Sequence, residues 1–214
     1  MPNLNKLFPV VFFGLFSVLT AATITSVQDG DWDVPSTWDS ASIPTSADDV
    51  IIANGHTVTI PTMVSVEMLS LTINSGGALY AGNFRPTLEV YGNWTNNGTF
   101  TAGNICTVIF KGAGNQSVDP GNDGFDYIEL DNASNANTIA ILDDIDISKD
   151  LTLTVGILDL SSVANPTIEI GGNVTIISGA VWTKGNGAVT LSGDLQNYAD
   201  PNSPPNNLGN VVVD

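Results

Sequence analysis

The sequence predicts an all-β protein in which short parallel strands stack into a β-solenoid. The first observation is an internal repeat: the segment from Pro86 to Gly112 returns, with the same Pro-Thr-x-Glu start, from Pro166 to Gly193. The two starts lie 80 residues apart, a period that would hold three or four coils of about 20 to 25 residues. The second is hydrophobic alternation in short runs separated by glycine- and asparagine-rich turns. An antiparallel sandwich shares the alternation but gives no reason for the repeat.

Composition supports a folded core and argues against several function classes. Hydrophobic residues make up 43% of the 214 residues and charged residues only 13%, the opposite of a disordered chain. The formal net charge is −17, with only five lysine and arginine residues. So few cations cannot form a basic patch, so we expect no nucleic-acid partner, and an anionic membrane would repel this surface.

Residues 1–22 have the pattern of a secretory signal peptide. Lys6 supplies the charged start, residues 7–19 the apolar segment, and Thr20-Ala21-Ala22 the small-residue cleavage site. The apolar segment is short for a transmembrane helix, which needs about 20 residues. We therefore expect a protein that is secreted or held at the cell surface, with no membrane insertion after cleavage. An uncleaved anchor is the alternative.

Residues 23–64 are expected to form an N-terminal cap and the first strands. An apolar strand at 50–52, the turn Asn54-Gly55 and a strand at 56–60 follow a loop-like stretch. That stretch carries Trp32 and Trp38, whose rings would cover the first exposed layer of a stacked sheet.

Residues 65–214 are expected to hold the solenoid repeats, with the last repeat truncated. Alternation places one side of each strand in the core. The lone cysteine, Cys106, has apolar flanks and is predicted to be a buried, inert thiol. The residues predicted to point inward are Leu71, Ile73, Leu88, Val90, Phe110, Ile128, Leu130, Ile168, Ile170 and Leu191.

The start of the mature chain resembles that of a known class of surface proteins. The resemblance rests on Gly30-Asp31-Trp32, Thr37-Trp38, Ile43-Pro44 and residues 48–52 and 55–58, and later on residues 70–80, 92–103 and 125–134. These segments are similar to secreted, adhesin-like β-solenoid proteins of the Bacteroidetes type, and the start is also similar to the eight-glycine domain. The resemblance implies export, often through the type IX pathway, and a right-handed parallel β-helix. It implies little about activity.

Clustered acidic residues make calcium the metal to consider. Asp29, Asp31 and Asp33 alternate but lack the glycine and glutamate that an EF-hand requires. Residues 119–124 and Asp143-Asp144 each offer several oxygens in one turn. Aspartate and asparagine are also ordinary turn residues, and asparagine side chains could form ladders between coils. We therefore assign no metal and no cofactor, with calcium as the alternative.

Outward aromatic rings are the candidate ligand contacts. Strand parity places Tyr91 on the outside, and Trp182 aligns in the repeat with Thr101, an outward position. Exposed rings can stack on the apolar face of a sugar, so Tyr91 and Trp182 are candidate ligand-binding residues. Packing against a neighbouring coil is the alternative. Trp94 aligns with Val174 and is predicted to be buried.

These patterns favour a non-catalytic, structural or adhesive segment whose partner is an extracellular glycan or another surface protein. One alternative is a carbohydrate-binding module, which would show a row of exposed aromatics. The other is a polysaccharide lyase or hydrolase of the parallel β-helix class. A lyase needs a cation to stabilise an enolate, and a hydrolase needs two carboxylates at a set separation. Cations are few, Asp143 and Asp144 are adjacent, and His56 is the only histidine, so no catalytic residue is assigned.

The final residues predict an unfinished coil. Residues 207–214 resemble the start of another copy of residues 125–132, with Val211 and Val213 in the core positions of Ile128 and Leu130. No polar cap follows Asp214, and an uncovered last coil presents unpaired backbone groups and a bare apolar core. We expect either a longer parent protein or end-to-end association through this edge.

Overall fold

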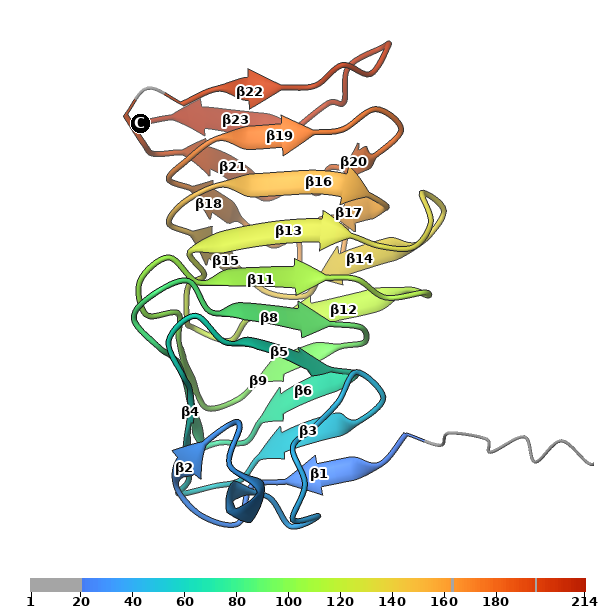
Figure 1. Ribbon diagram of the computed structural model, residues 1–214. Coiled ribbons are helices and arrows are strands. Elements are labelled where there is room, and N and C mark those ends of the chain that lie inside the picture. The colour runs from blue at the N-terminus through green and yellow to red at the C-terminus, as the bar shows by residue number, and fades with distance from the viewer. Residues whose placement is uncertain (1–20, 163, 195) are drawn as a thin grey trace, which may run out of the picture.

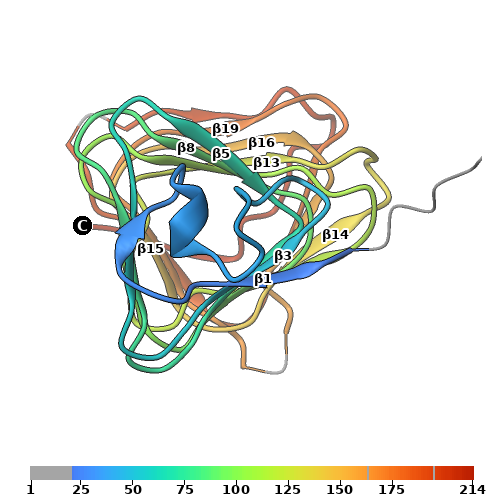
Figure 2. The same ribbon diagram turned by 60° about the horizontal axis from the view of Figure 1, so that its bottom comes forward.

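The computed structural model describes residues 21–162, 164–194 and 196–214. These residues form a rod of about nine stacked coils whose strands pair in parallel from coil to coil (Figure 1). A full coil contributes one strand to each of three faces, which gives the rod the roughly triangular outline seen in Figure 2. The predicted all-β parallel solenoid is confirmed.

Two of the three faces are single sheets along the rod. The eight-stranded sheet contains β1 (Thr23–Thr25), β3 (Asp49–Ile52), β6 (Ser70–Ile73), β9 (Trp94–Asn96), β12 (Gln116–Asp119), β14 (Thr138–Ile141), β17 (Ile157–Asp159) and β20 (Val181–Thr183). The seven-stranded sheet contains β5 (Ser65–Met68), β8 (Thr87–Val90), β11 (Thr107–Phe110), β13 (Tyr127–Asp131), β16 (Leu151–Val155), β19 (Val174–Ile176) and β22 (Tyr198–Ala199).

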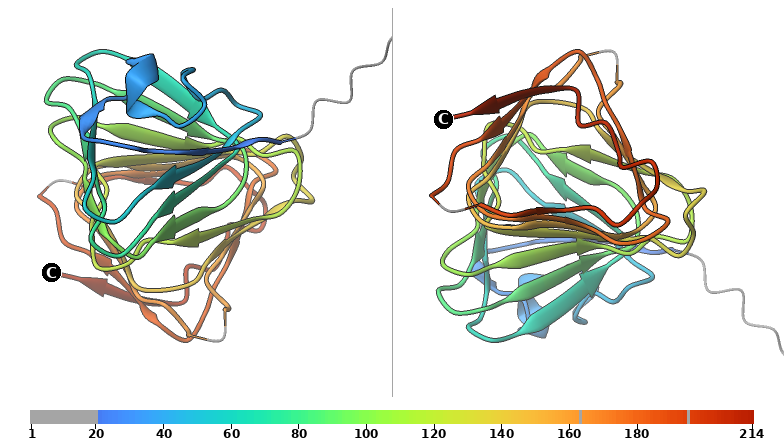
Figure 3. Two further views of the ribbon diagram at one scale, coloured as in Figure 1. Left: turned by 90° about the horizontal axis from the view of Figure 1, so that it is seen from below. Right: turned by 90° about the horizontal axis from the view of Figure 1, so that it is seen from above.

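The third face is divided into two four-stranded sheets, lower and upper in the view of Figure 1. The lower sheet contains β2 (Gly30–Asp31), β4 (Thr57–Ile60), β7 (Ala78–Ala81) and β10 (Thr99–Thr101). The upper sheet contains β15 (Ile145–Ile147), β18 (Ile168–Ile170), β21 (Ala188–Leu191) and β23 (Asn210–Val213). Between them, residues 120–126 replace a strand and make only an isolated parallel bridge, Phe125 to Ile147. Figure 3 shows the stacked coils from both ends of the rod. The break in the third face is where the acidic hollow described below lies.

The core follows from the alternation in the sequence. Each strand turns every second side chain inward, and stacked coils bury those side chains in continuous columns. Of the residues predicted to point inward, all are buried except Leu191, which is half-buried near the upper end of the rod. Trp94 is also buried, as predicted.

The coil length is as predicted, but the 80-residue repeat does not span a whole number of coils. Leu88 pairs with Val108, and Val174 pairs with Tyr198, so neighbouring coils are offset by the predicted 20 to 25 residues. The repeat, in contrast, relates strands on different faces. Leu71 of β6 lies in the eight-stranded sheet, whereas Leu151 of β16, its repeat counterpart, lies in the seven-stranded sheet.

The first coil differs from the others on the side of the seven-stranded sheet. Residues 32–48, which include the 3-10 helix η1 (Pro35–Thr37), take the place of a strand there. Trp32 and Trp38 are buried with their ring centroids 5.0 Å apart, and Trp38 Nε1 donates a hydrogen bond to the Trp32 carbonyl at 2.8 Å. Figure 2 shows η1 in front of the interior of the rod, in the region where the sequence predicts a cap.

Turn asparagines and aspartates join neighbouring coils mainly through backbone amides. Asn93 Oδ1 accepts a hydrogen bond from the Ser117 amide, and Asn115 Oδ1 accepts one from the Thr138 amide, each at 2.9 Å. A direct amide pair between coils also occurs, from Asn186 Nδ2 to Asn165 at 3.0 Å. The predicted side-chain ladders are therefore mostly side-chain-to-backbone bonds, because the turn amides point toward the adjacent coil.

The predicted signal peptide, residues 1–22, lies outside the described residues except for its last two. Within the described part of the chain, no helix is long and apolar enough to cross a membrane. At the other end, Val211 and Val213 lie in register with Val189 and Leu191, on the core side of β23 as predicted. Their exposed fractions are 41% and 78%.

Cys106 is buried, as predicted, and its chemistry can be tested. Burial raises the pKa of its thiol from 9.0 to about 12, with a smaller contribution from Asp126. The thiolate is the reactive form, so the folded protein should not react with a disulfide reagent at about pH 8, whereas the unfolded protein should. The contribution of this thiol to stability is complete below pH 9 and is lost as the pH rises toward 12. Rapid labelling before the unfolding transition would contradict the burial.

Candidate functional site

The seven-stranded sheet carries the site predicted at Tyr91. Tyr91 follows β8, and its side chain is half-buried on the outer face. Its hydroxyl donates a hydrogen bond to Glu89 Oε2 at 3.0 Å. The Nζ atom of Lys111, on the next coil, forms an ion pair with the same oxygen at 3.0 Å and lies 6.0 Å from the Tyr91 ring centroid. We call Glu89, Tyr91 and Lys111 the Tyr91 cluster.

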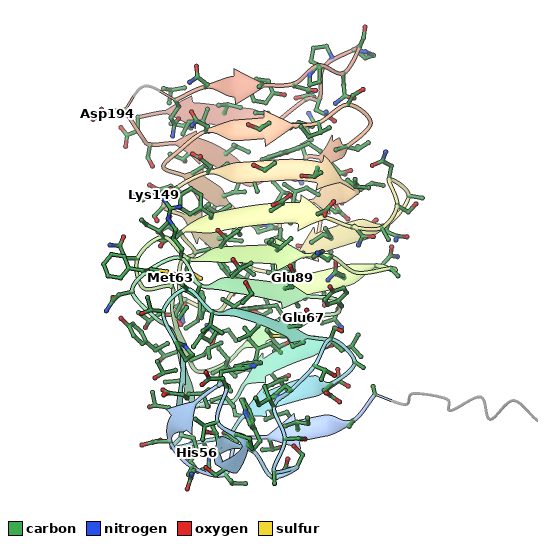
Figure 4. All side chains as sticks on the ribbon, viewed as in Figure 1. His56, Met63, Glu67, Glu89, Lys149 and Asp194 are labelled. Atoms are coloured by element: carbon green, nitrogen blue, oxygen red, sulfur yellow. The ribbon has the colours of Figure 1, made fainter. Side chains whose placement is uncertain are left out.

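The register of the sheet brings this cluster together. Val90 pairs with Phe110, both point into the core, and the residues that follow them are Tyr91 and Lys111. Alternation therefore turns Tyr91 and Lys111 outward side by side on adjacent coils. Glu89, two positions before Tyr91, is on the same side of β8 (Figure 4).

The cluster holds one cation among carboxylates. The hydrogen bond to Glu89 raises the pKa of Lys111, although desolvation opposes it. Burial, and then the Glu89 hydrogen bond, raise the pKa of Tyr91. Lys111 is therefore charged and Tyr91 protonated at neutral pH. Glu67 of β5 lies in register below Glu89, so the face remains acidic around the pair (Figure 4).

This arrangement can bind a polar ligand but offers only part of an aromatic ring for stacking. The Tyr91 hydroxyl, the Glu89 carboxylate and the Lys111 ammonium are a donor, an acceptor and a cation on one flat face. Lys111 lies over the Tyr91 ring, which leaves less of the ring free. The other half-buried tyrosines do not form a row with Tyr91. Tyr80 is on the lower four-stranded sheet, and Tyr127 is at the beginning of β13, whereas Tyr91 comes after the end of β8.

The prediction that Trp182 faces outward was wrong. Trp182 is the middle residue of β20, pairs with the buried Leu158 and is itself only 4% exposed. The structural counterpart of Trp182 is Phe100, the buried middle residue of β10, and not Thr101 beside it. The offset between the repeat copies grows by a residue or two along their length, and a slip of one residue turns a strand's side chains to the opposite face. Trp182 is a core residue.

A second site lies where the third face is interrupted. A hollow of about 330 Å³ there is lined by acidic side chains from two turns and two strands. The two turns, residues 119–124 and Asp143-Asp144, are those that the sequence offered separately as calcium ligands. The acidic residues lining the hollow are Asp123, Asp143, Asp144, Asp146 and Glu169.

Two of these carboxylates accept hydrogen bonds from backbone amides. Asp123 Oδ2 accepts a hydrogen bond from the Phe100 amide at 2.7 Å, and Asp144 Oδ1 accepts one from the Thr167 amide at 2.7 Å. Among the residues that the structure describes, no group of three or more histidine, cysteine, aspartate or glutamate side chains is arranged to hold a metal ion. The hollow is therefore an acidic surface that can attract a cation, without a set of converging ligands.

Asp146 and Glu169 are the pair in this hollow that acid–base chemistry could use. They lie in register on β15 and β18, with both side chains outward. Desolvation, followed by the charge of Glu169, raises the pKa of Asp146. A hydrolase needs one protonated and one ionised carboxyl group, and unequal pKa values of neighbouring carboxyls are the first requirement for it.

Sequence reasoning found Tyr91 but missed its partners. Glu89 and Glu169 are the glutamates of the two Pro-Thr-x-Glu copies, and the structure places one in the Tyr91 cluster and the other in the acidic hollow. The repeated Pro-Thr-x-Glu motif is therefore the sequence signal that marks these two outward carboxylates. His56 Nδ1 lies 3.0 Å from the Ser26 carbonyl oxygen and 3.1 Å from Ser26 Oγ, so these contacts connect His56 to the residue that follows β1.

The chain was also compared with known proteins. Comparison with protein-family models, with curated proteins and with solved structures gave no significant match.

Proposed function

We propose that the protein is a non-catalytic structural or adhesive β-solenoid, secreted or held at the cell surface, whose partner is an extracellular glycan or another surface protein. The observation that carries this proposal is the continuous outer face of the seven-stranded sheet, on which the Tyr91 cluster lies. A rigid rod with such a face can both space its neighbours and present a polar contact surface along its length.

Two further features support this function. The interior is filled by hydrophobic side chains, so ligands are limited to the outer faces and the ends. The outer positions of the seven-stranded sheet carry mostly threonine and glutamate, whose hydroxyl and carboxylate groups can bond the hydroxyls of a glycan. The net charge of −17 favours neutral glycans or cationic protein surfaces over acidic polysaccharides.

The Tyr91 cluster supplies the test of this proposal. Binding to an array of neutral glycans, with and without calcium, should reveal a ligand whose affinity falls about fivefold to tenfold in Tyr91→Ala, because stacking and one hydroxyl contact are lost. The matched control is Tyr80→Ala. Tyr80 is also half-buried and donates a hydrogen bond to Asn83 at 2.7 Å, but it lies on another face. The control should bind like the parent protein.

Other outcomes would redirect the assignment. Equal binding by the parent protein and Tyr91→Ala would mean that this cluster only stabilises the sheet. Release of new reducing ends from a bound glycan, abolished by Asp146→Asn, would support the second candidate, a glycan hydrolase. That candidate rests on the registered Asp146–Glu169 pair and on the raised pKa of Asp146.

A further inference from the structure

A groove runs along the first strand of the seven-stranded sheet, near the end of the rod that holds η1. Its volume is about 390 Å³. One side is β5 with the residue before it, from Val64 to Glu67, and the opposite side is formed by the loop that replaces a strand in the first coil. The residues lining the groove from that loop are Trp32, Asp33, Ile43, Pro44 and Thr45.

The β5 side of the groove is an open sheet edge. β5 is the terminal strand of its sheet and pairs only with β8. The Thr87 amide donates a hydrogen bond to the Val64 carbonyl at 3.2 Å, and the Tyr91 amide donates one to the Met68 carbonyl at 3.0 Å. The backbone groups of the even-numbered residues along β5 therefore point toward β8. In a parallel ladder the intervening residues, Ser65 and Glu67, direct their N–H and C=O groups the other way.

These four backbone groups are available at the groove. Both Ser65 and Glu67 line it and are exposed. Within the part of the chain that the structure describes, no hydrogen bond is made by the backbone N–H or C=O of either residue. A row of alternating donors and acceptors on a terminal strand is the template on which an extended peptide adds as a further strand.

The side chains of the groove select the chemistry of such a peptide. Its exposed apolar side chain is Ile43, set against the buried Trp32 and Pro44 that also line the groove, and its charges are the exposed carboxylates of Asp33 and Glu67. Side chains of a strand alternate between two faces, so an added strand would present apolar residues to the loop and polar residues to the solvent beside Glu67. Basic residues at the polar positions complement these two carboxylates and the acidic chain as a whole.

We propose that this groove binds an extended protein segment with alternating apolar and basic residues, which adds to β5 as a parallel or antiparallel edge strand. The strand length of β5, four residues, limits the ladder to a short segment. The inference goes beyond the proposed adhesive function and does not depend on the Tyr91 cluster, so Tyr91→Ala should leave this binding unchanged while it weakens glycan binding.

The test uses the whole mature protein and three capped synthetic peptides. The probe is Val-Lys-Val-Lys-Val; its controls are Val-Glu-Val-Glu-Val and the lysine peptide with its alternate amides N-methylated. Calorimetric titration should show saturable binding of the probe, and at least about tenfold weaker binding of both controls. Amide hydrogen exchange at Ser65 and Glu67, which is unprotected by hydrogen bonds in the free protein, should slow when the probe binds.

Two variants separate the backbone contribution from the charge. Glu67→Pro removes an outward N–H that no strand among the described residues uses, so it should reduce probe binding at least about tenfold while the protein still folds. Glu67→Thr keeps the N–H and loses the charge, and should reduce binding only about threefold. Hydrogen exchange in the parent protein keeps the test decisive even if the proline variant unfolds.

Five results would overturn the proposal. Four concern the peptides: the absence of probe binding up to about 1 mM, equal binding of the N-methylated peptide, equal binding of the glutamate peptide, and binding that leaves the Glu67 amide unprotected. Self-association of the protein that Glu67→Pro abolishes would likewise overturn it, because the occupant of the groove would then be a second copy of the chain.

Discussion

Replacing Gln116 by leucine is expected to lower the free energy of unfolding by about 3 kcal/mol or more. Gln116 is a buried polar residue of β12 at a core-facing position. Its Nε2 donates to the Val90 carbonyl at 3.0 Å and to the Gly92 carbonyl at 2.7 Å, and its Oε1 accepts from the Gly112 amide at 2.9 Å. Leucine fills a similar volume but leaves the Gly92 carbonyl and the Gly112 amide without these partners, and each costs about 1 to 3 kcal/mol. The Val90 carbonyl keeps the hydrogen bond from the Lys111 amide at 2.9 Å.

The same side chain also links two coils through a second amide. Asn132 Nδ2 donates to Gln116 Oε1 at 3.1 Å and to the Gly114 carbonyl at 2.9 Å, and Asn137 Nδ2 donates to Asn132 Oδ1 at 2.6 Å. The amide network therefore binds the corners of three successive coils where the seven-stranded sheet gives way to the eight-stranded sheet. Loss of Gln116 removes the bond from Asn132 and the bonds to the preceding coil, whereas the bonds of Asn132 to Gly114 and Asn137 do not involve it.

Urea denaturation of the parent protein and of two variants measures this contribution. Ser117→Ala is the control: Ser117 is the next residue of β12, on its outer side, and its side chain makes none of the network's bonds. The control should stay within about 0.5 kcal/mol of the parent protein. If Gln116→Leu also stays within that range, the network contributes specificity of register and not stability.

Alternation in the sequence was sufficient to predict the fold and most of the core, because the two-residue period alone decides which side chains of a strand are buried. It failed where polar residues occupy core-facing positions. Gln116 and Asn132 are buried because their side chains form hydrogen bonds with backbone groups of turns. No local sequence pattern shows which turn lies beside which strand. The prediction for Trp182 failed for a related reason, because the two repeat copies are shifted by one residue at that point.

For the candidate sites too, local sequence pattern predicts the direction of a side chain but not its neighbours. Parity alone turned Tyr91 outward, but its contacts with Lys111 come from the neighbouring coil, and coil length varies along the chain. The acidic hollow brings residues 119–124 and Asp143-Asp144 together only because the third face lacks a strand at that level. Such juxtapositions depend on the exact number of residues in each coil, which turn composition does not determine.

The break in the third face also explains the largest aromatic cluster of the rod. Trp94 of β9 packs edge-on against Phe100 of β10, with ring centroids 4.9 Å apart, and lies 5.3 Å from Phe125, which belongs to the loop that replaces the missing strand. Phe110 of β11 lies 6.5 Å away on the third side. Large rings thus fill the interior at the level where the lower and upper sheets do not continue into each other.

Replacing Trp94 by alanine should therefore lower the free energy of unfolding by about 3 to 5 kcal/mol, since it leaves a cavity that three other rings cannot close without moving. Trp94→Phe is the informative control. Trp94 Nε1 is buried and has no hydrogen-bond partner among the described residues, so phenylalanine removes an unsatisfied donor and keeps most of the packing. Its cost should be below about 2 kcal/mol.

Thermal and urea unfolding of both variants give the comparison. Equal, large losses in the two would show that the indole N–H is bound, by water or otherwise, whereas a small loss in Trp94→Ala would show that the cluster does not hold the two halves of the rod together.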